Sequence, residues 1–245
     1  MRLFVINTGY DMSDEEIEIR VQRMKRAASP DTTIHMECLE ETKICIDSQL
    51  DVALASPEII KKAIKAEKEG YDAVLLYCTS DPAMEACREA VKIPVIGGGM
   101  ASFLTAAAVG SRYSMIITSK ERESEKHRFI KASGLNSGDF ISVQSIEYDI
   151  LSMQKQKEKT DTVNQLTAAA RKCVADGADV VILGCLGFAG MGEAVSRAVG
   201  VPVIDPAFAM VGLAEALCRQ KLAQSRHAYC NPPKRARIWA GGSME

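Results

Sequence analysis

The sequence is poor in the side chains that build metal sites. Its 245 residues include three histidines, and these lie far apart at His35, His127 and His227. The eight cysteines include no pair with the CxxC spacing that zinc sites and dithiol centres use. We therefore predict no metal site.

The chain also lacks a long apolar run and an excess of charge. Its longest apolar stretches have the length of a strand, far below the ~20 residues that cross a bilayer. The formal net charge is -2, without the basic excess of nucleic-acid-binding proteins. The apolar run within Met1–Tyr10 is also too short for a signal peptide. We expect a cytoplasmic protein that binds neither nucleic acid nor a membrane, with free thiols rather than disulfides.

One stretch of the sequence occurs in two similar copies, Asp72–Gly98 and Asp179–Pro206. Each copy begins with Asp, continues with an apolar run, and reaches a cysteine six residues after that Asp. A turn, an amphipathic segment and a second strand signal follow, IPVIG or VPVID. Similarity at this spacing indicates two related halves. A pseudo-twofold relation between the halves would place Cys78 and Cys185 across one cleft.

Strand and helix patterns alternate along the chain. Strands are predicted at Arg2–Ile6, Thr32–Cys38, Ala73–Tyr77, Ile93–Ile96, Tyr113–Ile117 and Phe140–Ser145, and in the second copy. Helices are predicted at Asp14–Ala28, Pro57–Glu69, Met100–Val109, Lys120–Ala132, Asp161–Ala175 and Ala207–Leu222. Glu40–Leu54 is predicted as a loop, and the charges of Lys120–Ala132 as a solvated face. This alternation predicts an α/β architecture with parallel sheets.

Candidate binding residues follow from the rule that ligands of such sheets bind beyond the carboxyl ends of the strands. The residues at these ends combine two thiols, several hydroxyls and turn amides: Asn7, Thr8, Cys78, Thr79, Ser80, Thr118, Ser119, Cys185, Leu186 and Gly187. Ser48, in the predicted loop, is a further candidate. Capping of a turn or helix explains Asn7, Thr118 and Ser119 equally well.

The glycine run Gly97–Gly99 follows a predicted strand, as a dinucleotide-binding loop would. The third glycine position of GxGxxG falls on Ser102, however, and no acidic residue ends the next strand. We interpret the run as a tight turn into a helix, and Asp81 as the N-cap of the helix after Cys78.

Two cysteines at matching positions suit proton transfer at a stereocentre. A thiol pKa of about 8.5 can be lowered at a helix N-terminus, so one group can act as thiolate and the other as thiol. Placed on opposite faces of a carbon next to a carbonyl, one removes a proton and the other returns one, which inverts the centre. Turn amides can stabilise the oxyanion that forms.

At these residues the chain resembles the aspartate/glutamate/hydantoin racemase superfamily, and within it the hydantoin and allantoin racemases. The similar segments include the INTG start, the Ser48 loop, YCTSDPAMEACREAVKIPVIG, YSMIITS, GADVVILGCLGFAG and GVPVIDP. The resemblance implies two similar α/β lobes with the active site between them, no cofactor, and Cys78 and Cys185 as the catalytic pair. It also implies substrate contacts from Asn7, Ser80, Thr118 and the Leu186–Gly187 turn. We expect one lobe from residues 1–100 and 207–245, carrying Cys78, and the other from 101–206, carrying Cys185.

The substrate is less well defined by the sequence. Hydantoin-type members usually carry Phe-Gly-Asp-Pro after the first cysteine, where this chain has Thr79-Ser80-Asp81-Pro82. We expect a small-molecule substrate, a cyclic ureide such as a 5-substituted hydantoin or allantoin, and a homo-oligomer. The alternatives are an amino-acid racemase, a decarboxylase or maleate isomerase on the same scaffold, and a small-molecule binding protein.

Overall fold

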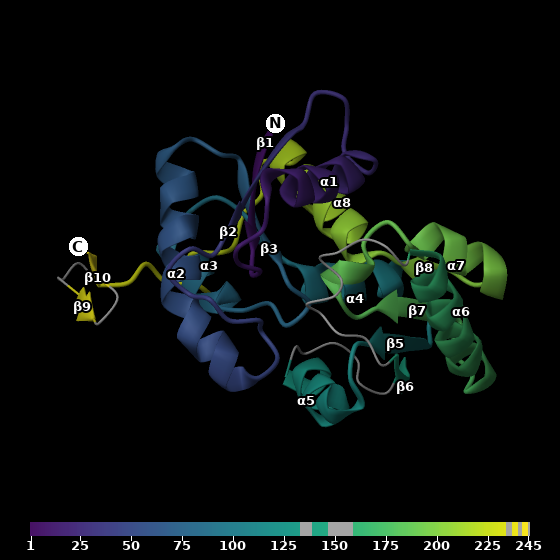
Figure 1. The fold of residues 1–245 in the computed structure, drawn as a ribbon. Helices are drawn as coiled ribbons and strands as arrows, with labels where there is room; N and C mark the ends of the chain where they lie inside the picture. The colour runs from purple at the N-terminus through teal and green to yellow at the C-terminus, as the bar shows by residue number, and fades with distance from the viewer. Residues whose placement is uncertain (133–138, 147–158, 234–236, 240–241, 245) are drawn as a thin grey trace.

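Two four-stranded parallel sheets organise the molecule (Figure 1). The computed structural model describes residues 1–132, 139–146, 159–233, 237–239 and 242–244. The first sheet and its helices comprise β1 (Arg2–Asn7), α1 (Asp14–Lys25), β2 (Thr33–Cys38), α2 (Gln49–Lys68), β3 (Ala73–Tyr77), α3 (Met84–Ala90), β4 (Val95–Gly97) and α4 (Gly98–Val109). The second comprises β5 (Tyr113–Ile117), η1 (Lys120–Arg122), α5 (Glu123–Ala132), β6 (Phe140–Ser145), α6 (Lys159–Ala175), β7 (Val180–Leu183), η4 (Leu186–Phe188), α7 (Gly192–Val199) and β8 (Val203–Ile204). The helix α8 (Pro206–Arg219) and a small hairpin of β9 (Arg237–Trp239) and β10 (Gly242–Met244) follow.

The two sheets have the same strand order. The first runs β2-β1-β3-β4 and the second β6-β5-β7-β8, and every pairing within them is parallel. The predicted α/β class with two related parallel sheets is therefore confirmed. The division of the chain at residues 100 and 206 stays a prediction.

The aspartate that opens each sequence copy has the same structural role in both sheets. The Asp72 carboxylate accepts a hydrogen bond of 2.6 Å from the Arg2 backbone N–H at the start of β1. The Asp179 carboxylate accepts bonds of 3.1 and 2.8 Å from the N–H groups of Ser111 and Arg112, just before β5. Each aspartate thus fixes the first strand of its own sheet beside the strand that carries the cysteine.

Alternate residues of the central strands face two different layers. In β1, Leu3 and Val5 join a central core shared by both sheets with α1, α4 and α8, whereas Phe4 and Ile6 pack under α2 and α3. In the second sheet, Val181 and the other outward residues pack under α6 and α7. Both faces of each sheet are covered, as the continuous apolar runs of the strands predict. None of the helices in the described part of the chain has the length and apolar character needed to cross a membrane.

The helix α2 begins earlier than the sequence predicts. It starts at Gln49, within the segment predicted as a loop, and Pro57 lies inside it rather than in its first turn. The Ser48 hydroxyl caps the helix by accepting the Asp51 N–H at 3.1 Å, and the Asp51 carboxylate accepts the Asp47 N–H at 3.0 Å. The first bond satisfies an N–H that the first helical turn leaves free, and the second ties the residue before the N-cap to that turn, so together they set the helix start.

Candidate active site

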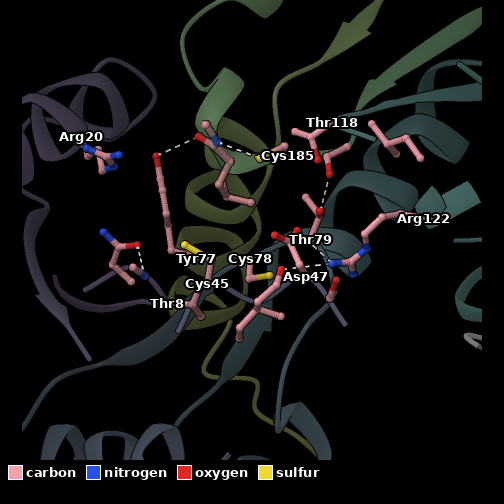
Figure 2. Close-up of a pocket in the computed structure, with 18 of the residues that line it drawn as sticks. Thr8, Arg20, Cys45, Asp47, Tyr77, Cys78, Thr79, Thr118, Arg122 and Cys185 are labelled. Atoms are coloured by element: carbon pink, nitrogen blue, oxygen red, sulfur yellow. Dashed lines mark hydrogen bonds and ion pairs between the residues drawn. The ribbon is translucent and has the colours of Figure 1, made fainter. Parts of the chain in front are cut away.

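The two cysteines of the repeat lie at equivalent positions and line one cavity. Cys78 directly follows β3, and Cys185 follows β7 after Gly184. The cavity has a volume of about 120 Å³, near the ~150 Å³ that suffices for a benzene-sized ring. Figure 2 shows both side chains among the residues that line it. Both cysteine residues are partly exposed, so a ligand in the cavity can reach them.

Two hydrogen bonds join the residues that flank each cysteine across the two sheets (Figure 2). Thr79, which follows Cys78, donates its hydroxyl to the Gly184 carbonyl at 2.5 Å. Tyr77, which precedes Cys78, donates to the Leu186 carbonyl at 3.3 Å. We call this reciprocal pair of bonds the cross-sheet brace. It fixes the backbone on both sides of one thiol relative to the backbone around the other.

The backbone N–H of the residue two positions after each cysteine favours the ionised form of that thiol. The Gly187 N–H donates to Cys185 Sγ at 3.4 Å, and the Ser80 N–H acts in the same sense on Cys78, whose pKa it lowers. Burial raises the pKa of Cys185 to about 11 in spite of the Gly187 bond. Burial also raises the pKa of Cys78, but the positive charge of Lys126 and the Ser80 N–H counteract it. Both donors stabilise a thiolate when one forms.

The glycine run supports the first cysteine turn. The buried Asp81 carboxylate accepts the N–H groups of Gly99 and Met100, each at 2.7 Å, so Asp81 caps α4 and not α3, whose N-cap is Ala83. A Cβ on Gly97 would lie 2.3 Å from the Asp81 carboxyl carbon, and one on Gly99 would lie 2.5 Å from the Thr79 carbonyl oxygen. The glycines therefore leave room for the Cys78 loop, but the predicted turn into a helix at Met100 is wrong in its bounds, because Gly97 ends β4 and α4 already begins at Gly98. Burial raises the pKa of Asp81 to about 6.

The structure brings most of the predicted site residues together. The cavity is lined by the predicted residues Asn7, Thr8, Cys78, Thr79, Ser80, Thr118, Cys185, Leu186 and Gly187. The side-chain amide of Asn7 also bonds within its own turn, accepting the Gly9 N–H at 3.0 Å. Ser48 and Ser119 do not line the cavity: Ser48 caps α2, and the Ser119 hydroxyl bonds to Glu121.

Several cavity residues were not predicted from the sequence. They are Gly9, Met12, Arg20, Cys45, Ile46, Asp47, Tyr77, Ile117, Gly184, Arg122 and Lys126. The interpretation of Lys120–Ala132 as a solvated face is wrong for Lys126, of which only 4% is exposed. The spacing of four residues between Lys126 and the buried Ile130 was the available signal.

The loop of Cys45 and Asp47 is held against the cavity by a buried carboxylate of α2. Glu58, 5% exposed, accepts the backbone N–H groups of Glu40 and Thr42 at 2.6 and 2.8 Å. Burial alone would raise the pKa of Glu58, but these hydrogen bonds lower it below its usual value. The carboxylate thereby anchors the start of the loop that ends at the cavity.

Known proteins resemble this chain along most of its length. The hydantoin racemase of Rhizobium meliloti is 28% identical over 193 residues, which are 78% of this chain and 79% of the relative. The hydantoin racemase of Paenarthrobacter aurescens is 28% identical over 219 residues, covering 89% and 91% of the two chains. The allantoin racemase from Klebsiella pneumoniae superposes with a TM-score of 0.90 at 24% identity, covering 99% of this chain and 98% of that one. This structural likeness shows a common fold.

The fold, the paired cysteine turns and these relatives together define an enzyme of the racemase class. The model of the Asp/Glu/Hydantoin racemase family matches residues 5–214, so the chain belongs to that family.

Proposed function

We propose that this chain is a cofactor-independent racemase of a cyclic ureide, a 5-substituted hydantoin or allantoin, and that Cys78 and Cys185 are its acid and base. The cross-sheet brace is the observation that carries the proposal, because it ties the turns of both thiols to one cavity. The hydantoin racemases among the relatives support the ureide as substrate class. The proposal includes a cytoplasmic location and a homo-oligomer.

In the proposed mechanism, one cysteine is a thiolate and the other a thiol when substrate binds. The thiolate removes the proton from the ring carbon next to the carbonyl, and the electron pair moves onto the carbonyl oxygen. The thiol on the opposite face then donates its proton to that carbon, and the centre is inverted. The two cysteines have exchanged protonation states, so the enzyme is ready for the mirror-image substrate.

We infer that Cys78 ionises before Cys185 in the free enzyme. The Lys126 charge and the Ser80 N–H counteract the effect of burial on the Cys78 pKa, whereas burial raises the pKa of Cys185 to about 11. We further propose Thr118 as a hydrogen-bond donor to the substrate carbonyl. Its hydroxyl lines the cavity and bonds to no residue in the described part of the chain.

Single-cysteine variants test the proposal. Each enantiomer of a 5-substituted hydantoin is incubated with wild type, Cys78→Ala or Cys185→Ala in deuterated buffer, with blanks without enzyme. Proton NMR reports exchange at the ring carbon, and optical rotation reports inversion. We expect both variants to lose inversion, and each to exchange one enantiomer with retention, the two variants acting on opposite enantiomers.

The exposed Cys230 supplies the matched control, and Cys230→Ala should racemise like wild type. Inversion that persists in both active-site variants would refute the two-thiol mechanism. Wild type that exchanges no hydantoin and no allantoin would refute the substrate class.

A further inference from the structure

The helix α5 places one ammonium group in the wall of the cavity. Lys126 is 4% exposed and lines the same space as Cys78 and Cys185. Its Nζ donates to the Ser80 hydroxyl at 3.1 Å and lies 5.7 Å from the centre of the Phe129 ring. Ser80 is one of the two positions where the turn after Cys78 departs from the Phe-Gly-Asp-Pro pattern, so the bond between these two side chains depends on that departure.

No carboxylate forms an ion pair with Lys126 in the described part of the chain, although the charges of Glu125 and Asp81 act on it from a greater distance. Lys126 has no acidic oxygen within 4.0 Å of its Nζ among the described residues. Arg122, one helical turn earlier, differs: it lies 3.2 Å from an oxygen of Asp47 and 2.6 Å from one of Glu125 (Figure 2 shows the Asp47 pair). The neutral Ser80 hydroxyl is thus the only hydrogen-bond acceptor that the described residues offer to Lys126.

The cavity as a whole is positively charged. Arg20, Arg122 and Lys126 line it, whereas Asp47 is the one carboxylate among the lining residues. Arg20 also has no acidic oxygen within 4.0 Å among the described residues, and its guanidinium donates to the Glu16 backbone carbonyl at 3.2 Å. A neutral ureide ring would leave Arg20 and Lys126 without an ion-pair partner among the described residues, whereas Arg122 is already paired with Asp47 and Glu125.

An unpaired ammonium in a buried site is unfavourable, because desolvation penalises the charged form. Burial accordingly lowers the pKa of Lys126, and the charges of Cys78, Glu125 and Asp81 counteract this only in part. A carboxylate that enters with the ligand would pair with Lys126 and would accept a further hydrogen bond from Ser80. Such charge-assisted bonds are among the strongest available in a protein site.

We propose that the substrate is a cyclic ureide whose side chain ends in a carboxylate, and that Lys126 and Ser80 bind that carboxylate. This inference rests on the proposed racemase function and narrows its substrate class. Ring-closed ureides of acidic amino acids have the required chemistry. Their neutral ring presents the reacting carbon to the two thiols, and their anionic side chain reaches Lys126 on α5.

The test compares two substrates that differ only in charge, 5-(2-carboxyethyl)hydantoin and its carboxamide, 5-(2-carbamoylethyl)hydantoin. The measured quantity is the ratio of their kcat/KM values for ring-carbon proton exchange in deuterated buffer. Wild type should favour the carboxylate by about 10- to 100-fold, the range expected for a charged hydrogen bond. Lys126→Met should bring the ratio close to one, and Lys126→Arg should retain a preference for the carboxylate.

The ratio separates substrate recognition from effects on the thiols and on folding. Loss of the charge near Cys78 lowers the rate of both substrates alike, so it does not change the ratio. Lys131→Met, at an exposed position of the same helix, is the matched control and should keep the wild-type ratio. Ser80→Ala should lower the ratio by a smaller factor than Lys126→Met does.

Three outcomes decide the matter. A wild-type ratio near one, with both hydantoins exchanged, would refute the carboxylate inference and leave the racemase proposal standing. The carboxylate inference would also be refuted if Lys126→Met lowered the exchange rates of both hydantoins and left their ratio unchanged, because Lys126 would then act only on Cys78. Absence of exchange with both hydantoins in wild type would refute the proposed function and this inference with it.

Discussion

Removal of the cross-sheet brace should slow racemisation by displacing one thiol from the other. Thr79→Val replaces the hydroxyl with a methyl group of similar size and removes the bond to Gly184, the residue just before Cys185. Because Thr79 is 4% exposed, the Gly184 carbonyl loses a buried donor, at a cost of about 1–3 kcal/mol in the free energy of unfolding. A displacement near 1 Å at a catalytic group costs ~100-fold in rate. We expect kcat/KM to fall about 10- to 100-fold.

Tyr77→Phe removes the second, longer bond of the brace and should have a smaller effect. Either bond alone still connects the two turns, so the double variant should lose more activity than the product of the single losses. The assay is ring-carbon proton exchange and optical rotation for each enantiomer, with urea unfolding for stability. Since racemisation has an equilibrium constant of one, kcat/KM must fall equally from both enantiomers.

The control is Thr105→Val, which removes a 2.8 Å bond from a threonine hydroxyl to the Ala101 carbonyl within α4, away from the cavity. It should leave racemisation unchanged. Wild-type rates in Thr79→Val, Tyr77→Phe and the double variant would refute the reasoning, because the positions of the thiols would then not depend on the brace.

Three further predictions concern the glycine run, the thiols and α8. Gly99→Ala places a Cβ 2.5 Å from the Thr79 carbonyl oxygen, so it should cost about 1–3 kcal/mol of stability and lower activity; an unchanged urea midpoint would contradict this. Since burial raises the pKa of Cys78, its thiolate is scarce near neutral pH, so kcat/KM should rise with pH as Cys78 ionises and fall as Cys185, with its pKa of about 11, ionises in turn; a flat profile would exclude thiol catalysis. Burial alone would raise the pKa of Glu215, but hydrogen bonds from Thr32 and its neighbours lower it to about 2, below the ordinary ~4.3. Its stabilising contribution of ~3 kcal/mol is therefore complete above pH ~4.3 and lost as pH falls toward 2, and Glu215→Gln should remove that pH dependence of urea unfolding.

The sequence predicts the sheets and the cysteine positions well because both depend on local patterns. The strands Ala73–Tyr77 and Tyr113–Ile117 have the bounds that their apolar runs predict. The duplicated sequence segment forms the third and fourth strands of each sheet's order, which is the same in both sheets. Cys78 and Cys185 lie at strand ends, where the order of elements along the chain determines their place in a parallel sheet.

The start of α2 was missed because two local signals compete. Ser56-Pro57 resembles a helix start. In α2, however, Pro57 has no backbone N–H that could be left unpaired, and the Ser56 hydroxyl donates to the Val52 carbonyl at 2.6 Å within the helix instead of capping it. The decisive signal was Ser48 followed by Asp51, a capping pair with Asp in place of the usual Glu.

Two cationic residues of the cavity, Arg122 and Lys126, were missed because their positions depend on contacts with residues distant in sequence. Whether Arg122 and Lys126 face solvent or the cavity depends on how η1 and α5 pack against Asp47 and Ser80, which belong to the first sheet's half of the chain. The charge pattern of Lys120–Ala132 carries no information on those partners. The same limit applies to the Cys45 loop, whose anchor Glu58 lies on α2.

The position of α8 in the chain has a consequence for synthesis on the ribosome. The strands of the first sheet are complete at Gly97, yet the helix that packs against β3, β4 and α1 begins only at Pro206. Its Met210, Val211 and Ala214 are fully buried in the core that this sheet shares with the second one. While the second sheet is being translated, α1 and α4 cover only part of that face of the nascent first sheet, and its native packing is reached only after α8 has left the exit tunnel.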